Sequence, residues 1–355
     1  MRLRRLLLYA APPATVAVGM AFGPSLGPKQ AAPSNASPPM PQPIDCSVHE
    51  EGVEARFNYQ DVSVKALSTR RDGSSSDGHL IGANWNPQRV LVRDGRREKK
   101  PRTLDANGFA MLADAKPQHS EYYDERAVVG DYYAACEELV KRVSGASLVV
   151  AFDHNVRCDT GKAWGRRLRG GNRVQGAAAL VHNDYTADSA SRRLAMLTQP
   201  PTLLKESLRA KYGTTPLLRG PAVDDAIAGK RRYAFVNVWR PISTVESKPI
   251  GCIDATTVSS DELVTLTVHH ADEGTDGGIY FASHRPAHKW FYYPAMTPDE
   301  VLLIKQWDSH GGMARGDAAD KGHATFTLHS AFADPTTMPT ARDRESIEVR
   351  LVLIY

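Results

Sequence analysis

The second half of the chain is dense in short strand-like segments, and no other feature of the sequence limits the fold as strongly. Residues 232–241 form an extended apolar run that a proline stops. Strands that follow one another without intervening helices pair in antiparallel order, whereas parallel sheets need long crossover connections. The pattern therefore predicts an antiparallel barrel or sandwich. Further segments of the same character lie at residues 263–268, 279–281, 290–293, 301–307, 324–328 and 347–355.

Helical patterns are confined to the first half of the chain. Residues 124–145 carry apolar side chains at helical spacing and end on a glycine, where a helix would stop. We expect another helix over residues 188–197, capped by Asp188 or Ser189, and a further one over residues 202–211. The expected fold class is mainly β with flanking helices, an α+β arrangement. Additional short strands are predicted at residues 89–95 and 147–152, and residues 104–109 are predicted to be a turn that enters another strand.

Composition indicates an enzyme-sized globular protein. The chain has 355 residues, of which 42% are hydrophobic and 24% are charged, enough for one large or two ordinary domains. The formal net charge of +4 is small and does not call for a nucleic-acid partner. The four cysteines include no C-x-x-C pair, so the sequence indicates neither a disulfide framework nor a zinc finger. We expect free thiols in a reducing compartment, the cytoplasm.

The first 45 residues differ in composition from the rest. Arginines precede the mildly apolar run 6–22, no acidic residue occurs before Asp45, and residues 27–43 contain six prolines. The run is too short and too broken by proline and glycine for a stable membrane span. It fits a secretory signal, an organellar presequence over residues 1–30, or an extension without function. We therefore predict a targeting-like or disordered extension over residues 1–45 and a single domain over residues 46–355.

A His-x-Asp step at residues 182–184 is the first candidate for a metal site. In an extended strand alternate side chains share a face, so His182 and Asp184 point the same way while Asn183 points the opposite way. An imidazole and a carboxylate on one face supply two ligands of a facial iron site, which keeps positions open for a co-substrate and oxygen. A single His-x-Asp is more often a surface pair. The assignment therefore depends on a third ligand from elsewhere in the chain.

The third ligand is expected near the carboxyl end. His329 follows the strand-like run 324–328 and precedes the last predicted strand, so we prefer it to His323. The histidines at positions 269, 270, 284, 288 and 310 rank lower. His154 stands directly after Asp153, which is the wrong order for this motif, and we expect it to have a structural hydrogen-bonding role.

A candidate anion clamp opens the last strand. Arg344 and Ser346 share a face by the period-2 rule, and a guanidinium with a neighbouring hydroxyl can hold the far end of a dicarboxylate. Viewed alone, the same alternation also fits a half-exposed strand. Arg342 and Arg350 remain alternative partners for the carboxylate.

Two further segments bear on the site. In residues 232–241, alternation places Asn237 and Trp239 on one face and Arg240 on the other. Residues 157–173 carry six basic side chains among glycines. This segment fits either a solvated mobile loop or a basic lid over an acidic substrate, and we favour the solvated loop.

The order of these motifs resembles one family, the AsaB-type hydroxylase/desaturases, which include CmcJ-like and gibberellin-desaturase-like proteins. They form part of the Fe(II)/2-oxoglutarate-dependent oxygenase superfamily. The resemblance spans about residues 85–355 in the expected order, and an Arg- and Gly-rich insert before His182 departs from it. The matching stretches are Leu104–Phe109, Gly145–Ser147, Phe152–Arg157, Val181–Asp184, Asn237–Pro241, His288–Met296, Asp299–Ser309, His329–Phe332 and Arg344–Arg350.

This resemblance implies a double-stranded β-helix, or jelly-roll, core and the oxidation of a small natural product with Fe(II), 2-oxoglutarate and O2. It implies that iron is bound by His182, Asp184 and His329. Arg344 and Ser346 would hold 2-oxoglutarate. Three further residues, Asn237, Arg240 and Lys305, would line the site.

Two other functions use the same residues. A non-catalytic jelly-roll protein would bind a small molecule and keep the His-x-Asp without activity. A zinc-dependent hydrolase would use the three ligands and a bound water, and would leave Arg344 and Ser346 without a role. The sequence leaves open the substrate, the choice between hydroxylation and desaturation, and the oligomeric state.

Overall fold

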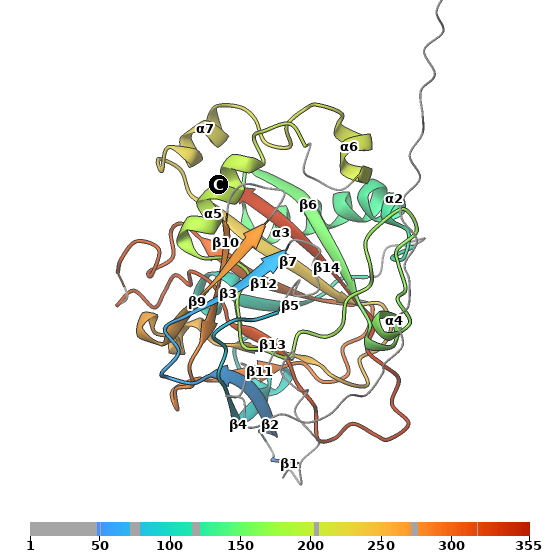
Figure 1. The fold of residues 1–355 in the computed structure, drawn as a ribbon, viewed down its shortest axis with the longest axis vertical. Coiled ribbons are helices and arrows are strands. Elements are labelled where there is room, and N and C mark those ends of the chain that lie inside the picture. The colour runs from blue at the N-terminus through green and yellow to red at the C-terminus, as the bar shows by residue number, and fades with distance from the viewer. Residues whose placement is uncertain are drawn as a thin grey trace, which may run out of the picture. The chain divides into compact units, whose positions relative to one another are not determined.

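Two layers of antiparallel-rich sheet enclose the apolar interior of the chain. A computed structural model describes residues 48–49, 51–71, 79–115, 121–201, 206–270, 276–317 and 319–355. The first layer is a five-stranded antiparallel sheet in the order β5-β12-β7-β14-β6, seen near the centre of Figure 1. Its strands are β5 (Phe109–Ala113), β6 (Leu148–Arg157), β7 (Tyr233–Pro241), β12 (Glu300–Asp308) and β14 (Ser346–Ile354).

The facing layer consists of two smaller sheets. Six strands pair in the order β1-β2-β4-β11-β8-β13, and three pair in the order β10-β9-β3. The six are β1 (Val48–His49), β2 (Gly52–Gln60), β4 (Trp85–Asp94), β8 (Ile250–Ile253), β11 (Trp290–Tyr292) and β13 (His329–Ala331). The three are β3 (Ala66–Arg71), β9 (Leu263–His270) and β10 (Asp276–Ala282).

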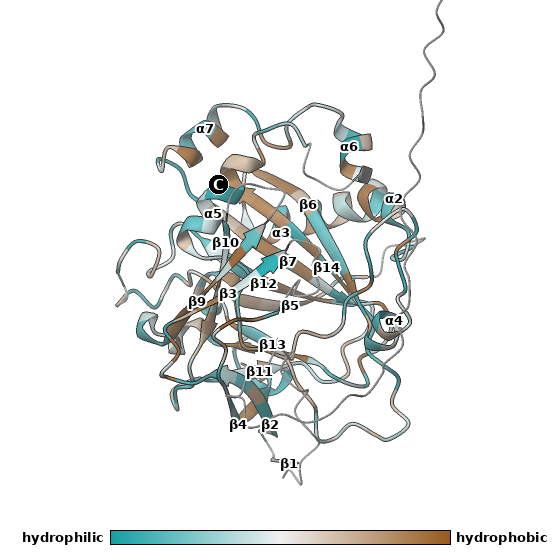
Figure 2. Ribbon diagram, in the orientation of Figure 1, coloured by the Kyte–Doolittle hydropathy of each residue, from teal (hydrophilic) through white to brown (hydrophobic). Residues whose placement is uncertain are grey.

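The five-stranded sheet is apolar on both faces, because each face covers a different core. Val149, Val236 and Val349 pack on the outer face against the helix over residues 133–144. Phe152, Phe235 and Val352 pack on the inner face against side chains of the smaller sheets. Alternation along each strand sends neighbouring side chains to these two cores. Figure 2 shows these strands largely in brown, with the second half of β6 in teal.

Among the described residues the α-helices all lie before residue 228, which extends beyond the first half of the chain to which the sequence patterns assigned them. The expected helix over residues 124–145 consists of α2 (Glu125–Ala127), a π-helical turn (Val128–Tyr132) and α3 (Tyr133–Ser144), and it ends at Gly145, whose φ is 69°. The remaining helices are α1 (Leu104–Asn107), α4 (Asp159–Ala163), α5 (Ala187–Met196), α6 (Glu206–Tyr212) and α7 (Pro221–Ile227). Short 3-10 turns cover Gly95–Arg97, Ala255–Thr257 and Ser260–Glu262.

Two local predictions are wrong. The N-cap of α5 is Thr186, which forms a capping box with Ser189. The helix therefore begins at Ala187, before both of the predicted caps, Asp188 and Ser189. Residues 324–328 are not a strand; the pairing begins at His329, because only β13 finds a partner in β8. The segment 157–173, expected as a solvated loop, contains α4, and its Arg169 pairs with Asp124 at 2.9 Å.

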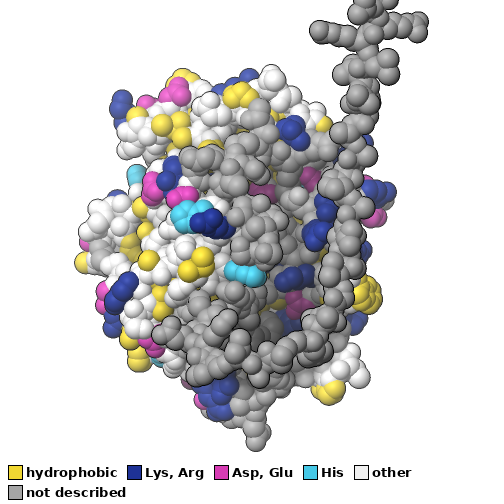
Figure 3. All heavy atoms as spheres, viewed as in Figure 1, with side chains coloured by type: hydrophobic (Ala, Val, Ile, Leu, Met, Phe, Trp, Pro, Cys, Tyr) yellow, Lys and Arg dark blue, Asp and Glu magenta, His cyan; other side chains and the backbone are white. Residues whose placement is uncertain are grey.

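The predicted extension over residues 1–45 lies outside the residues that the structure describes. Within the described part of the chain, no helix combines the length and hydropathy that crossing a bilayer requires. The three described cysteines, Cys136, Cys158 and Cys252, are buried free thiols. On the face that Figure 3 shows, basic and acidic side chains are interspersed, in keeping with the small net charge.

Candidate metal centre

The backbones of His182 and His329 pair with each other and bring two distant imidazoles together. The His182 N–H donates to the His329 carbonyl at 3.2 Å, and the His329 N–H donates to the His182 carbonyl at 2.8 Å. Residues that exchange both hydrogen bonds in an antiparallel pair stand directly opposite each other, with their side chains on one face. The two ring centroids are 4.5 Å apart. His182 also bridges to Phe281 of β10, so it joins the two smaller sheets.

Asp184 completes a cluster of three potential metal ligands. One ligand atom from each of His182, Asp184 and His329 lies within 4.8 Å of the others, and no other such group occurs among the described residues. His182 Nε2 lies 3.8 Å from Asp184 Oδ1. Asn183 points the other way, where its Oδ1 accepts from the Tyr280 N–H at 2.8 Å. The segment thus follows the alternation that the sequence predicts.

Both histidines are neutral at neutral pH. Burial lowers the pKa of His182 to about 4, and the neighbouring His329 adds to that shift. Burial also lowers the pKa of His329, whose Nδ1 has no hydrogen-bond partner among the described residues. The His182 Nδ1–H donates to the Leu180 carbonyl at 2.9 Å, which places the lone pair on Nε2. Neutral imidazoles with available lone pairs are the form that binds a metal ion.

The second oxygen of Asp184 is held from the facing sheet. Asn237 of β7 donates through Nδ2 to Asp184 Oδ2 at 2.9 Å, and Arg350 of β14 donates through Nε at 3.5 Å. Burial alone would raise the pKa of Asp184. The Arg350 guanidinium, the two imidazoles and the Asn237 amide together hold that pKa well below its usual value. Asp184 is therefore a carboxylate at any physiological pH.

The site is built on the polar half of the inner face of the five-stranded sheet. Along β6, β7 and β14 this face changes from aromatic and aliphatic side chains to polar ones. The strand register places Arg350 opposite both Asn237 and Asp153, and Ser346 opposite Arg157. The polar residues of this face are Asp153, Asn155, Arg157, Asn237, Ser346, Glu348 and Arg350.

The two predicted clamp residues, Arg344 and Ser346, lie on this polar half, and each has a hydrogen-bonding atom without a partner among the described residues. Arg344 and Ser346 are 4% and 1% exposed. Arg344 donates through Nη1 to the Lys248 carbonyl at 2.6 Å, but its Nε and the Ser346 Oγ have no partner among the described residues. Burial lowers the pKa of Arg344 to about 10, and the nearby Arg157 adds to the shift. Buried donors without acceptors are costly, so two of them on one face mark a place for an anionic ligand.

Sequence reasoning missed three residues at the site. Arg157 ends β6 opposite Ser346. Burial is the largest cause of the lowered pKa values of Arg344, His182 and His329, and the positive charge of Arg157 lowers each of them further. Glu348 lies 3.4 Å from Arg350, between it and Ser346 on the same strand face. A third residue, Gln306, accepts the Asp184 N–H at 3.1 Å. Alternation from Ser346 would have located Glu348, but the sequence carries no signal for Gln306.

The expectation that Arg240 lines the site needs correction. Its side chain lies on the outer face of β7, where Nε donates to the Tyr132 hydroxyl at 2.9 Å and Nη1 donates to the Pro298 carbonyl at 2.6 Å. Nη2 pairs with Asp114. Alternation along β7 sends Asn237 inward and Arg240 outward, so the two residues cannot share a pocket. Arg240 ties the helical segment to the sheet.

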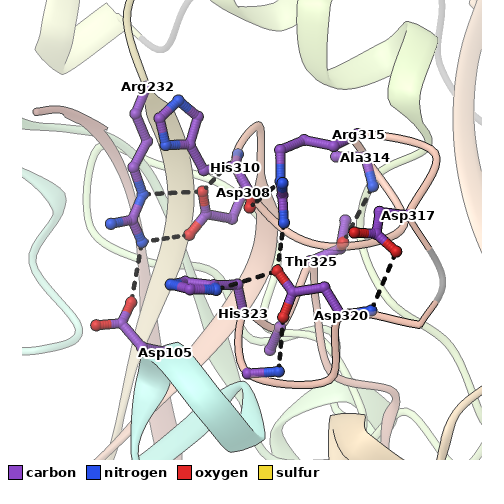
Figure 4. A network of polar contacts seen from close by, with 12 residues as sticks. Asp105, Arg232, Asp308, His310, Ala314, Arg315, Asp317, Asp320, His323 and Thr325 are labelled. Atoms are coloured by element: carbon purple, nitrogen blue, oxygen red, sulfur yellow. Dashed lines mark hydrogen bonds and ion pairs between the residues drawn. The ribbon is translucent and has the colours of Figure 1, made fainter.

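Lys305 also lies away from the metal cluster. Its Nζ donates to Asp308 Oδ2 at 2.8 Å and to the Ala324 carbonyl at 3.1 Å. Arg232 binds the same Asp308 carboxylate at 2.6 Å, as the network in Figure 4 shows. Lys305 continues the alternation of Val301 and Leu303, which pack in the outer core, so it lies on the face opposite to the one that carries Asn237.

We therefore expect Asp308→Asn to destabilise the fold by about 3–5 kcal/mol, because the buried Lys305 would lose its counter-charge. Burial tends to raise the pKa of Asp308, but Lys305 and Arg232 outweigh it and lower that pKa. The stabilisation is thus complete above the unfolded pKa and is lost only as the pH falls through the lowered folded value. Urea denaturation measures the effect. If a Lys305→Met variant had native stability but a raised KM for 2-oxoglutarate, Lys305 would have to be assigned to the co-substrate site.

The alternative candidates lie elsewhere. His323 is exposed and its Nδ1 pairs with Asp320 at 3.2 Å (Figure 4). Arg342 is 67% exposed in its side chain and pairs with Glu246. His154 lies on the outer face of β6, where its Nδ1 bonds the Tyr133 hydroxyl at 2.8 Å, in agreement with the structural role expected for it.

Comparison with known proteins identifies the family. The family described as Oxidoreductase/YMDC permease-like domain matches residues 59–354. The chain belongs to this oxidoreductase family. Similar proteins include a hydroxylase/desaturase, efuI, of Hormonema carpetanum, which is 28% identical over 88% of this chain and 98% of its own length. The alpha-ketoglutarate-dependent dioxygenase tstK of Talaromyces stipitatus is 25% identical over 84% of this chain and 99% of its own length. The predicted membership of the AsaB-type hydroxylase/desaturases is confirmed.

A solved structure confirms the fold. The structure of the iron and alpha-ketoglutarate-dependent endoperoxidase NvfI matches 86% of this chain and 99% of its own chain, with a TM-score of 0.66 and 23% sequence identity. The family match begins at Tyr59, in β2, and ends at Ile354, the last residue of β14. It therefore includes both layers of the jelly roll and every residue of the metal cluster.

Proposed function

We propose that this chain is an Fe(II)/2-oxoglutarate-dependent oxygenase that hydroxylates or desaturates a small-molecule natural product. The observation that carries the proposal is the convergence of His182, Asp184 and His329 beside a polar sheet face with unsatisfied cationic donors. Relatives across most of the chain are a hydroxylase/desaturase and an alpha-ketoglutarate-dependent dioxygenase. The proposed catalytic domain is the single domain predicted over residues 46–355.

The donor set fits Fe(II). Two neutral imidazoles and one carboxylate, gathered on one side, form the facial arrangement that non-haem iron oxygenases use. The second oxygen of Asp184 is occupied by Asn237 and Arg350, which leaves Oδ1 facing the histidines. Three protein ligands on one side leave room for further ligands on the other.

The anion pocket fits 2-oxoglutarate. We assign its distal carboxylate to the Arg344 guanidinium and the Ser346 hydroxyl, whose orphaned Nε and Oγ would gain acceptors. Arg157 stands opposite Ser346 and supplies a second positive charge to the same pocket. A dianion would relieve the electrostatic cost of two guanidinium groups close together, of which Arg344 is buried. Asn237 acts on the metal side, through Asp184.

When bound, iron and 2-oxoglutarate supply the oxidising power that activates O2 and removes hydrogen from an unactivated C–H bond. The protein's own part is placement. The paired backbones of His182 and His329 fix both imidazoles, and Gln306 fixes the backbone of Asp184. The aromatic core around Phe235 and Tyr185, whose rings stack at 4.6 Å, closes the apolar half of the interior against water.

Anaerobic addition of Fe(II) and 2-oxoglutarate to the metal-free protein tests the function. We expect a visible charge-transfer band that needs both components, and release of succinate once oxygen is admitted. A colourless mixture without succinate would favour a non-catalytic binding protein. Turnover of a substrate with Zn(II) in the absence of oxygen would favour the hydrolase.

A further inference from the structure

Arg350 holds more acidic groups than any other guanidinium near the metal cluster. Its Nε lies 3.5 Å from Asp184 Oδ2, its Nη1 lies 2.6 Å from Asp153 Oδ2, and its Nη2 lies 3.4 Å from Glu348 Oε1. The side chain is 17% exposed. When the Asn155 amide is turned to its better-bonded orientation, its oxygen also accepts from both terminal nitrogens at 2.9 and 3.1 Å. Every nitrogen of the guanidinium therefore has a protein partner.

This saturation separates Arg350 from Arg344. Arg344 has a buried Nε that no residue satisfies, as expected for a group that awaits a ligand. Arg350 has no donor to spare for a co-substrate carboxylate. Of Arg344 and Arg350, only Arg344 has a donor without a partner, which a clamp needs.

The two oxygens of Asp184 have different surroundings. Oδ1 faces His182 Nε2 at 3.8 Å, whereas Oδ2 receives the Arg350 Nε–H and the Asn237 amide. A carboxylate gripped at one oxygen cannot rotate freely, so the other oxygen keeps a fixed direction. The strand register enforces this arrangement, because Arg350 and Asn237 are directly paired between β14 and β7.

We propose that Arg350 is a positioning residue for the iron centre, which holds Asp184 by Oδ2 so that Oδ1 alone is presented to the metal. This inference rests on the proposed function. A carboxylate that binds through one oxygen leaves coordination positions for 2-oxoglutarate and O2, whereas one that binds through both would occupy a further position.

The local charges support the same role. Asp184, Asp153 and Glu348 place three negative charges around the single positive charge of Arg350. Arg350 therefore holds the three carboxylates together beside the metal cluster.

The test compares Arg350→Gln with the wild type in Co(II) and Fe(II) binding and in the visible d–d spectrum of the Co(II) form. We expect the metal dissociation constant to rise roughly 10- to 100-fold, as is typical when the residue supporting a metal ligand is lost. The Co(II) spectrum should also change, because Asp184 Oδ2 then keeps only the Asn237 amide and the carboxylate is held less firmly. Arg350→Lys should recover part of the affinity, since one cationic donor remains.

A double variant separates positioning from folding. Arg350→Gln removes the cation that contacts Asp153 at 2.6 Å, and adding Asp153→Asn removes the negative charge of that side chain. If Arg350 acts through Asp184, the Arg350→Gln/Asp153→Asn protein regains thermal stability and keeps the weak metal binding and the altered Co(II) spectrum. Recovery of wild-type metal affinity in the double variant would overturn the proposal.

Two other results are decisive. Wild-type metal affinity with a lost 2-oxoglutarate response in Arg350→Gln would make Arg350 a co-substrate ligand and overturn the positioning role. Wild-type protein that binds neither Co(II) nor Fe(II) would instead refute the proposed function, whatever the variants do.

Discussion

Asp184→Ala is expected to abolish Fe(II) binding and 2-oxoglutarate-dependent oxygen consumption together. The variant removes the only anionic member of the cluster and leaves two neutral imidazoles, which hold Fe(II) weakly. The loss should exceed the roughly 100-fold that removing a supporting residue typically costs. Metal analysis of protein reconstituted anaerobically, with oxygen uptake in the presence of 2-oxoglutarate, measures it. His329→Ala should behave in the same way, because it removes the ligand supplied by β13.

His323→Ala is the matched control. His323 lies on the same late segment, is exposed, and pairs with Asp320 rather than with the cluster. It should keep one equivalent of iron and wild-type oxygen uptake. If His323→Ala lost iron while His329→Ala retained it, the ligand set would have to be reassigned.

Arg344→Met has the second largest expected effect, which is the loss of 2-oxoglutarate binding with iron binding intact. Removing one partner of a buried charged pair costs about 2–5 kcal/mol, or roughly a 30- to several-thousand-fold rise in the dissociation constant. Anaerobic titration of the charge-transfer band measures 2-oxoglutarate affinity, and metal analysis measures iron separately. Arg344→Glu should abolish co-substrate binding altogether, because it places a carboxylate against a carboxylate.

The stability of Arg344→Met gives an independent measurement. In the absence of ligand, Arg344 is a buried cation with an unsatisfied donor, and its pKa is lowered to about 10 by burial. Replacing it with an apolar side chain of similar length should leave the ligand-free protein as stable as the wild type or more stable. 2-Oxoglutarate should raise the melting temperature of the wild type and not that of the variant. A variant that still responds to 2-oxoglutarate would contradict the clamp.

Arg342→Met is the control for the clamp. This arginine precedes Arg344 by one alternation step, but its side chain is largely exposed and pairs with Glu246. Exposed ion pairs contribute about 1 kcal/mol or less. We therefore expect wild-type affinity for 2-oxoglutarate and nearly unchanged stability.

The sequence by itself determined the local elements and the nature of the chemistry. The alternation of apolar side chains located most strands of the five-stranded sheet, including β7 and β14, because successive side chains of a strand point to opposite faces of the sheet. The same rule placed Asn237 and Arg240 on opposite faces of β7, which the structure bears out. His-x-Asp, His329 and Arg-x-Ser, in that order, indicated the family.

Only the tertiary structure decided which of these side chains meet. His182 and His329 come together because their backbones pair with each other, while His182 also bridges to Phe281 of another sheet, and no local pattern encodes that pairing. Register shifts in β12 after Lys305, and in β6 at Phe152, interrupt the regular alternation that sequence reasoning depends on. Arg344 and Arg350 are the same residue type on one strand face. They differ in role because long-range neighbours satisfy every nitrogen of Arg350 and leave one nitrogen of Arg344 free, and contacts of that kind are fixed only when distant strands pack together.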